Sequence, residues 1–259
     1  RKPESELTQK EMDIARSVQE VTEEIVLKMA RHVRKVTQKK YLCLAGGVAL
    51  NCVSNGKLLR SRTFDDIYIQ PAAGDAGGAI GAALIAWHQF LGKERKTDGI
   101  NDYMNGAYLG PKYSNENIKA YLDRNGLIYV KLKDQELPEK IADLISEEKV
   151  IGWFQGRMEF GPRALGSRTI IGDARSPKTQ RVINLKIKYR ESFRPFAPSV
   201  REEDISEYFD IDRPSPYMLL VAKVAKDKQL PMTTEQELYF GLKKLNIPRS
   251  EIPAVTHVD

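Results

Sequence analysis

Apolar side chains recur every three or four positions from residue 9 to about residue 37, which is the spacing of an amphipathic helix. Thr8 and Glu11 stand at the start of this stretch with the spacing of a capping box, in which each side chain satisfies a free backbone N–H at the helix N-terminus. The pattern therefore predicts one long, well-capped helix.

Two units of the same kind follow, each made of an apolar strand, a glycine turn and a segment with helical spacing. Alternating strands and helices are typical of an α/β fold, in which ligands bind where the strands end. The first unit comprises a strand at 41–45, a turn at Gly46 and Gly47 and a helix over 48–59, and the second comprises a strand at 64–71, a turn at 74–78 and a helix over 79–91.

A polar stretch with several Gly and Asn residues then interrupts the pattern, and we place a domain boundary near 98–106. The domains predicted in this way are 1–100 and 101–259. The second also reads as α/β, with helical spacing at 114–124, a strand at 127–132, a helix at 136–147 and a strand at 150–154.

One segment of the second domain, 177–190, fits two patterns. Ser176 and Pro177 are a good helix start, whereas the following residues alternate between apolar and polar as a strand does. We favour a helix that continues to about Lys186.

Composition excludes several classes of protein. The 259 residues are 41% hydrophobic and carry both charge signs, which is globular rather than disordered composition. Two cysteines without CxxC spacing make neither a disulfide framework nor a zinc site. The longest apolar run, about 76–91, is too short to span a bilayer. We expect a cytoplasmic protein with no membrane partner. The absence of an initiator Met suggests an excised piece of a longer chain.

The net charge of +6 is unevenly distributed. Residues 149–201 contain twelve Lys and Arg against three acidic residues, a net charge of +9, so the remainder of the chain is slightly acidic. An anionic partner would therefore bind to this block rather than to the surface in general.

The first glycine turn suits an anion or a nucleotide. Glycines at a helix N-terminus allow the backbone to approach a ligand, and free N–H groups point toward it. Asn51 falls on the first helical turn, where its amide can bind a ribose or phosphate oxygen, although a tight turn with a solvated Asn51 is an equal alternative. The GxGxxG pattern and the P-loop pattern are both absent, which argues against a Rossmann dehydrogenase and a P-loop NTPase.

The second glycine turn contains one carboxylate, Asp75. A lone Asp before a helix is more often an N-cap than a metal ligand, and a metal needs further ligands. The three histidines, His32, His88 and His257, are too scattered to supply them by spacing.

The arginines of the basic block stand beside glycines and prolines, which hold side chains toward one place. Guanidinium groups bind phosphate in a bidentate manner, so this set predicts a polyphosphate or carbamoyl phosphate site. Interleaved aromatic residues also permit a nucleic-acid groove, but the turn-like setting favours a small anion over nucleic acid. The residues concerned are Arg157, Arg163, Arg168, Arg190 and Arg194.

Four motifs in order resemble one family, the carbamoyltransferases of natural-product and nodulation-factor biosynthesis. They are LCLAGGVALNCVSNGKLL, QPAAGDAGGAIGAAL, GWFQGRMEFGPRALGSRTIIGDAR and KYRESFRPFAPSV. The resemblance implies the C-terminal part of a Kae1-like, actin-type ATPase domain followed by a YrdC-like α/β domain. It also implies that carbamoyl phosphate and ATP form carbamoyl adenylate, and that a small acceptor receives the carbamoyl group at a hydroxyl or amine.

The resemblance also assigns roles to residues. Asp75 matches the metal-binding aspartate of the family, whose divalent metal is expected to be iron. The nucleotide-contacting turns correspond to Gly46, Gly47, Asn51, Gly77 and Gly78. The ATP and carbamoyl phosphate region corresponds to Arg157, Arg163, Arg168, Lys186, Lys188, Arg190 and Arg194.

The match departs from the family at both ends. The metal histidines and the first phosphate loop belong to an N-terminal half that precedes this segment, and the family pattern continues beyond residue 259. We therefore expect a fragment that is incomplete for metal coordination and for transfer. Two alternatives are a threonylcarbamoyl-adenylate enzyme of tRNA modification and a non-catalytic nucleotide- or RNA-binding module. The acceptor is not predicted.

Overall fold

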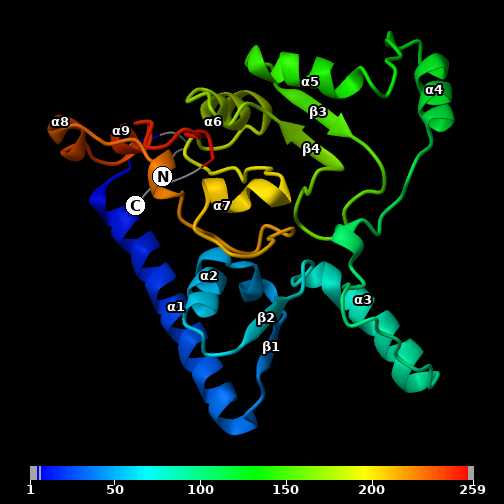
Figure 1. The fold of residues 1–259 in the computed structure, drawn as a ribbon, viewed down its shortest axis with the longest axis vertical. Coiled ribbons are helices and arrows are strands. Elements are labelled where there is room, and N and C mark those ends of the chain that lie inside the picture. Colours follow the sequence, from blue (N-terminus) through cyan, green and yellow to red (C-terminus); the bar gives the residue numbers. More distant parts are fainter. Residues whose placement is uncertain (1–4, 6, 256–259) are drawn as a thin grey trace.

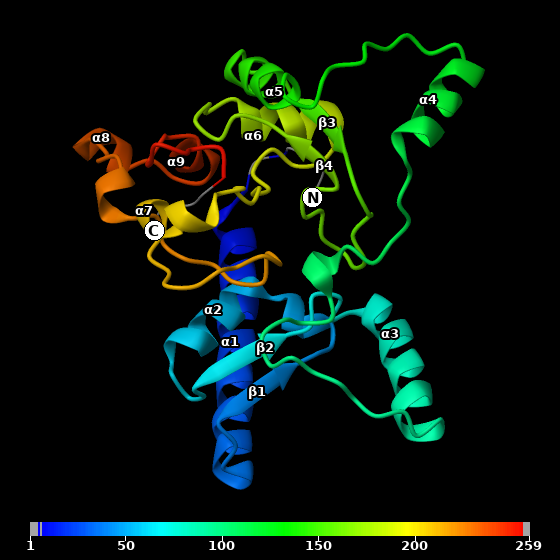
Figure 2. The same ribbon diagram turned by 45° about the vertical axis from the view of Figure 1, so that its right-hand side comes forward.

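The computed structural model describes residue 5 and residues 7–255 (Figures 1 and 2). Helix α1, Gln9–Thr37, has the predicted bounds. Its first turn is closed by Glu11, whose carboxylate accepts hydrogen bonds from the Thr8 N–H at 2.8 Å and from the Thr8 hydroxyl at 2.5 Å. The helix ends at Gln38, which adopts a left-handed conformation with φ of 53°. The capping signal in the sequence is therefore confirmed.

The first sheet consists of two parallel strands, β1 (Tyr41–Leu44) and β2 (Asp66–Ile69), in the register Tyr41↔Asp66 to Leu44↔Ile69. Parallel strands require a crossover, which helix α2 (Cys52–Arg60) supplies. One continuous helix over 48–59 was wrong, because a 3₁₀ turn at Gly47–Leu50 is separated from α2 by Asn51. Helix α1 covers this unit by packing Ala30, Leu58 and Phe64 into one core cluster.

Helix α3, Asp75–Ile85, follows β2 and continues into a π-helical turn at Ala86–Phe90. It begins four residues earlier than predicted, so Gly77 and Gly78 lie within its first turn and not before it. The N-cap place is occupied by Gly74, and the expectation that Asp75 is the N-cap was wrong. Both views show α3 projecting away from the first sheet.

The second part of the chain contains α4 (Asn115–Arg124), α5 (Leu137–Ser146) and an antiparallel pair, β3 (Ile151–Phe154) and β4 (Arg168–Ile171). The strand predicted at 127–132 was wrong. Ile128 is fully exposed and Val130 is 81% exposed, and no strand among the described residues pairs with this segment. Strand β4 was not predicted, and it places Arg168 at the start of a strand rather than in a turn.

Short elements complete the described chain. The ambiguous segment is helical, as favoured, and ends one residue beyond Lys186. The short helices are α6 (Thr179–Val182), α7 (Ile205–Tyr208), α8 (Thr234–Glu237) and α9 (Leu242–Leu245). A π-helical turn follows α6 at Ile183–Ile187, and 3₁₀ turns lie at Asn105–Ala107, Glu202–Asp204 and Lys226–Lys228. The described residues thus form a mixed α/β structure with two small sheets.

A segment that follows α7 returns to the first sheet, as the orange ribbon above α2 shows (Figure 1). Leu219 is buried there in one cluster with Ala49, Ile69 and Ala73. Its carbonyl accepts a hydrogen bond at 3.1 Å from the buried amide of Asn55. Residues remote in sequence therefore complete the core of the first sheet.

The chain exposes 18,588 Å² of surface, whereas a compact protein of its mass exposes roughly 11,500 Å². Many large apolar side chains are among the exposed residues. One stripe along α1 is at least half exposed and comprises Ile14, Val18, Val21, Ile25, Met29 and Val36. Within residues 5 and 7–255, the search for a helix with the length and apolar character of a membrane span found none.

The start of α3 gives a matched test of packing. A Cβ at Gly77 would lie 2.3 Å from the Ala72 carbonyl oxygen, whereas a Cβ at Gly78 would meet no atom within 4 Å. We expect Gly77→Ala to lower the free energy of unfolding by about 1–3 kcal/mol through overpacking. Gly78→Ala should be neutral or stabilising by up to ~1 kcal/mol, because alanine favours helix. Urea unfolding of both variants measures the difference, and equal stability of the two would contradict this packing.

Candidate anion site beside the second sheet

A hollow of about 380 Å³ lies where the chain leaves β3 and returns as β4. Lys112 and Arg157 both line it and face each other across an isolated antiparallel bridge. Within the described part of the chain, neither cation has a carboxylate at ion-pair distance. The other lining residues are Tyr108, Gln155, Gly156 and Ser167. The hollow is therefore a concave, cationic place with polar groups around it, which suits a small anion.

The shape of the loop beside the hollow depends on Glu159, a carboxylate only 7% exposed. Its Oε1 accepts hydrogen bonds from the N–H groups of Leu165 at 2.7 Å and Ser167 at 2.8 Å, and its Oε2 accepts from the Arg168 N–H at 3.1 Å. Burial raises the pKa of Glu159, but these backbone donors lower it more, so the pKa lies below its usual value. Glu159 is therefore ionised at neutral pH and fixes residues 165–168.

Arg168 supports the rim of the hollow. Its guanidinium lies 3.5 Å from the ring centre of Phe154. Its Nη1 donates to the carbonyls of Gln155 at 2.7 Å and Ser167 at 3.0 Å, and its Nη2 donates to that of Gly156 at 3.2 Å. Most of its donors are therefore used within the protein. Arg157 differs, because its exposed side chain makes one hydrogen bond among the described residues, from Nη1 to the Gly110 carbonyl at 3.1 Å.

Arg163 lies at the junction between the two parts of the chain. Its Nη2 donates to the Leu50 carbonyl at 3.2 Å, next to the first glycine turn. Its Nε is buried and has no hydrogen-bond partner among the described residues. The sequence grouped Arg163 with the anion-binding arginines, but in the fold it contacts the first unit.

The remaining cations of the basic block form a second group, none of which lines the hollow. The Arg190 Nε donates to Asn184 at 2.6 Å and its guanidinium lies over Phe196. Burial, and then the neighbouring Arg194, lower the pKa of Arg190 from its usual value. Arg194 forms an ion pair with Glu191 at 2.8 Å. Lys186 and Lys188 are exposed.

The two glycine turns lie together at one edge of the first sheet, as parallel strands require. The Gly46 N–H donates to the Ala73 carbonyl at 2.8 Å, which joins the turns directly. Gly46 has a φ of 97°, a conformation that favours glycine. Gly46, Gly47 and Gly78 all face open space, so a ligand can approach their backbones. Gly77 instead packs against Ala72.

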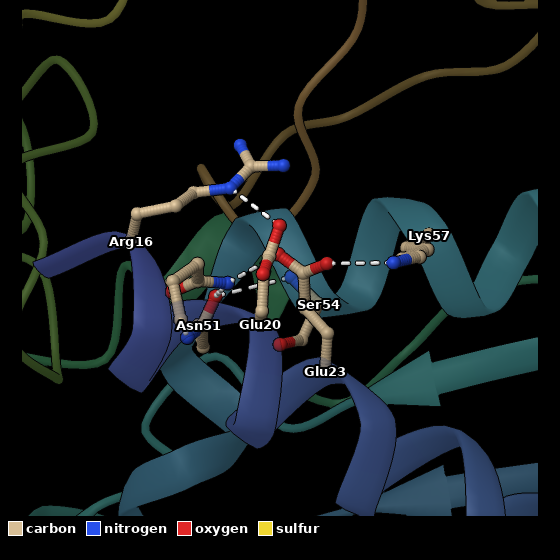
Figure 3. Close-up of polar contacts among 7 residues, drawn as sticks. Arg16, Glu20, Glu23, Asn51, Ser54 and Lys57 are labelled. Carbon is tan, nitrogen blue, oxygen red and sulfur yellow. Dashed lines mark hydrogen bonds and ion pairs between the residues drawn. The ribbon is translucent and has the colours of Figure 1, made fainter. Parts of the chain in front are cut away.

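Asn51 has a structural role at this edge, shown in Figure 3. Its Oδ1 caps α2 by accepting the Ser54 N–H at 3.1 Å, and its Nδ2 donates to Gln19 of α1 at 2.9 Å. Nearby, Lys57 forms an ion pair at 2.8 Å with Glu23 and holds the pKa of that carboxyl below its usual range. These contacts tie α1 to α2 and fix the turn that Asn51 ends.

Asp75 lies exposed on the first turn of α3. The described residues include no group of three or more His, Cys, Asp and Glu side chains that could hold a metal ion. Within residues 5 and 7–255, Asp75 therefore lacks the further ligands that a resident divalent metal requires. The residues described here do not fit such a metal by themselves, and no chemical step is assigned to one.

Reasoning from the sequence missed Lys112 and Glu159. Lys112 lies in a loop far from the basic block, and only the bridge to Arg157 brings it to the hollow. Glu159 did leave a signal, because it is the only acidic residue in the segment that runs from Arg157 to Arg168. A lone carboxylate among arginines and glycines is a candidate organiser of a loop.

Comparison with known proteins adds a family to this geometry. Residues 2–84 match the family model described as the carbamoyltransferase N-terminus, and residues 142–259 match that of the carbamoyltransferase C-terminus. The predicted boundary at 98–106 falls between the two matches and stays a prediction.

Several curated proteins are similar over most of the chain. An uncharacterized protein of Synechocystis is 59% identical over all of this chain and 42% of its own length. Nodulation protein NolO of Bradyrhizobium diazoefficiens is 45% identical over 85% of this chain and 40% of its own length. Nodulation protein NolNO of Sinorhizobium fredii is 40% identical over 97% of this chain and 34% of its own length. The chain thus spans about two fifths of the length of these relatives.

The two matched models together indicate a class of protein that contains both the N-terminal and the C-terminal carbamoyltransferase domain. The chain belongs to the carbamoyltransferase family, which confirms the resemblance drawn from the four motifs.

The carboxylate of Glu159 makes a testable contribution to stability. We expect Glu159→Gln to lower the free energy of unfolding at pH 7 by about 1–3 kcal/mol, because an amide cannot accept from all the N–H groups that the carboxylate satisfies. The folded pKa lies below the ordinary value of 4.5, so the contribution is full above that pH and is lost as the pH falls through the folded pKa.

Urea unfolding at pH 7 and below pH 4 measures both effects. The matched control is Glu147→Gln, which removes the same charge from an exposed side chain. A difference between wild type and Glu159→Gln that grows on acidification would argue against the stated role.

Proposed function

We propose that this chain forms part of an ATP-dependent carbamoyltransferase. In this proposal the second part of the chain activates carbamoyl phosphate as carbamoyl adenylate. The first part takes part in passing the carbamoyl group to a hydroxyl or amine of a small acceptor. Family membership supports the transfer chemistry in general. The observation that carries the assignment of the site is the hollow with Lys112 and Arg157, which have no carboxylate partner among the described residues.

The proposed activation is balanced as follows. Hydrolysis of carbamoyl phosphate releases phosphate and carbamate, and a carbamate oxygen attacks the α-phosphorus of ATP. The bond between the α-phosphorus and the bridging oxygen breaks, and pyrophosphate leaves with that oxygen. In the transfer step the acceptor oxygen or nitrogen attacks the carbamoyl carbon, AMP leaves, and the acceptor loses its proton to the surroundings.

The residues of the hollow suit the charges of this reaction. Negative charge builds on the departing pyrophosphate, and cations already held in place stabilise it without rearrangement. Arg157 and Lys112 are assigned to that role, while Arg168 and Glu159 hold the loop. The open glycines at 46, 47 and 78 suit the nucleotide. A divalent metal, iron by resemblance, belongs to the proposal only as a group for which Asp75 would be one ligand.

The proposed reaction makes pyrophosphate release depend on carbamoyl phosphate. The protein at its full natural length should release pyrophosphate from ATP only when carbamoyl phosphate is present, because carbamate is the nucleophile. A coupled pyrophosphate assay with and without carbamoyl phosphate measures this. The control replaces carbamoyl phosphate by inorganic phosphate. Equal pyrophosphate release under all three conditions would overturn the proposed function.

Arg157 is the arginine that lines the hollow, so its removal tests the assigned role directly. We expect Arg157→Ala to reduce carbamoyl phosphate-dependent pyrophosphate release by about 10²–10³-fold, the usual cost of removing a group that stabilises transition-state charge. Stability should change by less than about 1 kcal/mol, because the side chain is exposed and makes one hydrogen bond.

The matched control for Arg157→Ala is Arg181→Ala. It removes the same charge from the basic block at an exposed position of α6 outside the hollow. Full activity in Arg157→Ala, or an equal loss in both variants, would place the site elsewhere.

A further inference from the structure

The loop that follows Glu159 contacts the glycine turns of the first unit as well as the hollow. Phe160 and Leu165 pack against a buried cluster that contains Ala72. Gly161, with φ of 125°, approaches so closely that a Cβ there would lie 3.2 Å from the Ala72 Cβ. At its other end the loop includes Ser167, which lines the hollow. One short loop therefore touches both candidate ligand regions.

Arg163 makes the polar contact of this loop with the first unit. Its Nη2 donates to the Leu50 carbonyl, and the next residue, Asn51, caps α2 and bonds to α1. Arg163 thus attaches to the residue before Asn51, and Figure 3 shows Asn51 held between α1 and α2. No ion pair of Arg163 occurs within the described residues.

The unsatisfied donor of Arg163 needs an explanation. Its Nε is buried without a hydrogen-bond partner in the described part of the protein, which is uncommon for a buried polar atom. A side chain that only held the loop against the first unit could be apolar, and would then leave no buried donor unpaired. The loop is therefore held to the first unit by a contact that is not fully optimised.

We propose that Arg163 is a positioning residue that couples the anion hollow to the first glycine turn. The proposal rests on the proposed function, because carbamoyl phosphate is taken to bind in the hollow, beside the cations that stabilise the departing pyrophosphate. An anion bound at Ser167 and Arg157 shifts the position of the loop, whose base is fixed by Glu159. Arg163 passes this shift to the Leu50 carbonyl, and so to the backbone of residues 46–51. Coupling of this kind changes ligand affinity at the second region by roughly 5–150-fold and is reciprocal.

Hydrogen exchange of the full-length protein tests the coupling, with carbamoyl phosphate as the probe. In wild type, carbamoyl phosphate should slow exchange of amides in 155–167 and, by several-fold, in 46–51. In Arg163→Met the protection of 155–167 should persist while that of 46–51 is lost. Arg163→Lys retains a donor for the Leu50 carbonyl, so this variant should show the protection of residues 46–51 again. Arg60→Met is the matched control, because Arg60 also bonds a remote carbonyl, that of Val221, away from the turns.

The outcomes separate the two proposals. Protection of 155–167 without any change at 46–51 in wild type would overturn the coupling and leave the proposed function standing. A wild-type response in Arg163→Met would do the same. Absence of protection at 155–167 would overturn both. If Arg163→Met does not fold, Arg163→Gln is measured in its place: loss of protection at 46–51 with retention at 155–167 supports the role of Arg163, and a wild-type response overturns it.

Discussion

The buried carboxylate of Glu159 is the interaction on which the rest of the site depends. A buried charge is tolerated only when hydrogen bonds replace its water, and here backbone N–H groups of residues 165, 167 and 168 do so. The loop between β3 and β4 lacks regular secondary structure, so these bonds take the place of a strand ladder. They set the direction in which Ser167 and Arg168 enter β4, and with it the wall of the hollow.

Arginines with similar sequence surroundings do different work in this fold. Arg168 spends its donors on carbonyls and on the face of Phe154, so it maintains shape. Arg157 keeps its charge exposed beside Lys112. Arg163 binds the other unit. The net charge of the basic block therefore overstates the charge available to a ligand, because a guanidinium that is surrounded by carbonyls has few donors left for an anion.

Local signals in the sequence predicted the elements whose causes are local. The capping box of α1, the helical spacing of α4 and the apolar run of β3 each determine structure within a few residues. The strand expected at 127–132 failed because a strand needs a partner, which no local pattern supplies. Reasoning from the sequence missed β4 and the place of Lys112 beside the hollow, because both depend on pairing with residues distant in the sequence. The helix predicted over 48–59 is interrupted at Asn51, because the side chain of Asn51 caps α2.

The first sheet shows why the two parts of the chain are best understood together. Two strands alone form a marginal sheet, which needs further packing to be stable. Much of that packing comes from the segment near Leu219, whose side chain joins the core and whose carbonyl satisfies the buried amide of Asn55. A bidentate ion pair between Arg213 and Asp66, at 2.6 and 3.0 Å, fixes the same segment and lowers the pKa of Asp66. Residues on both sides of the predicted boundary near 98–106 therefore contribute to the core of the first sheet, and Ala73 of the second glycine turn packs in one cluster with Leu219.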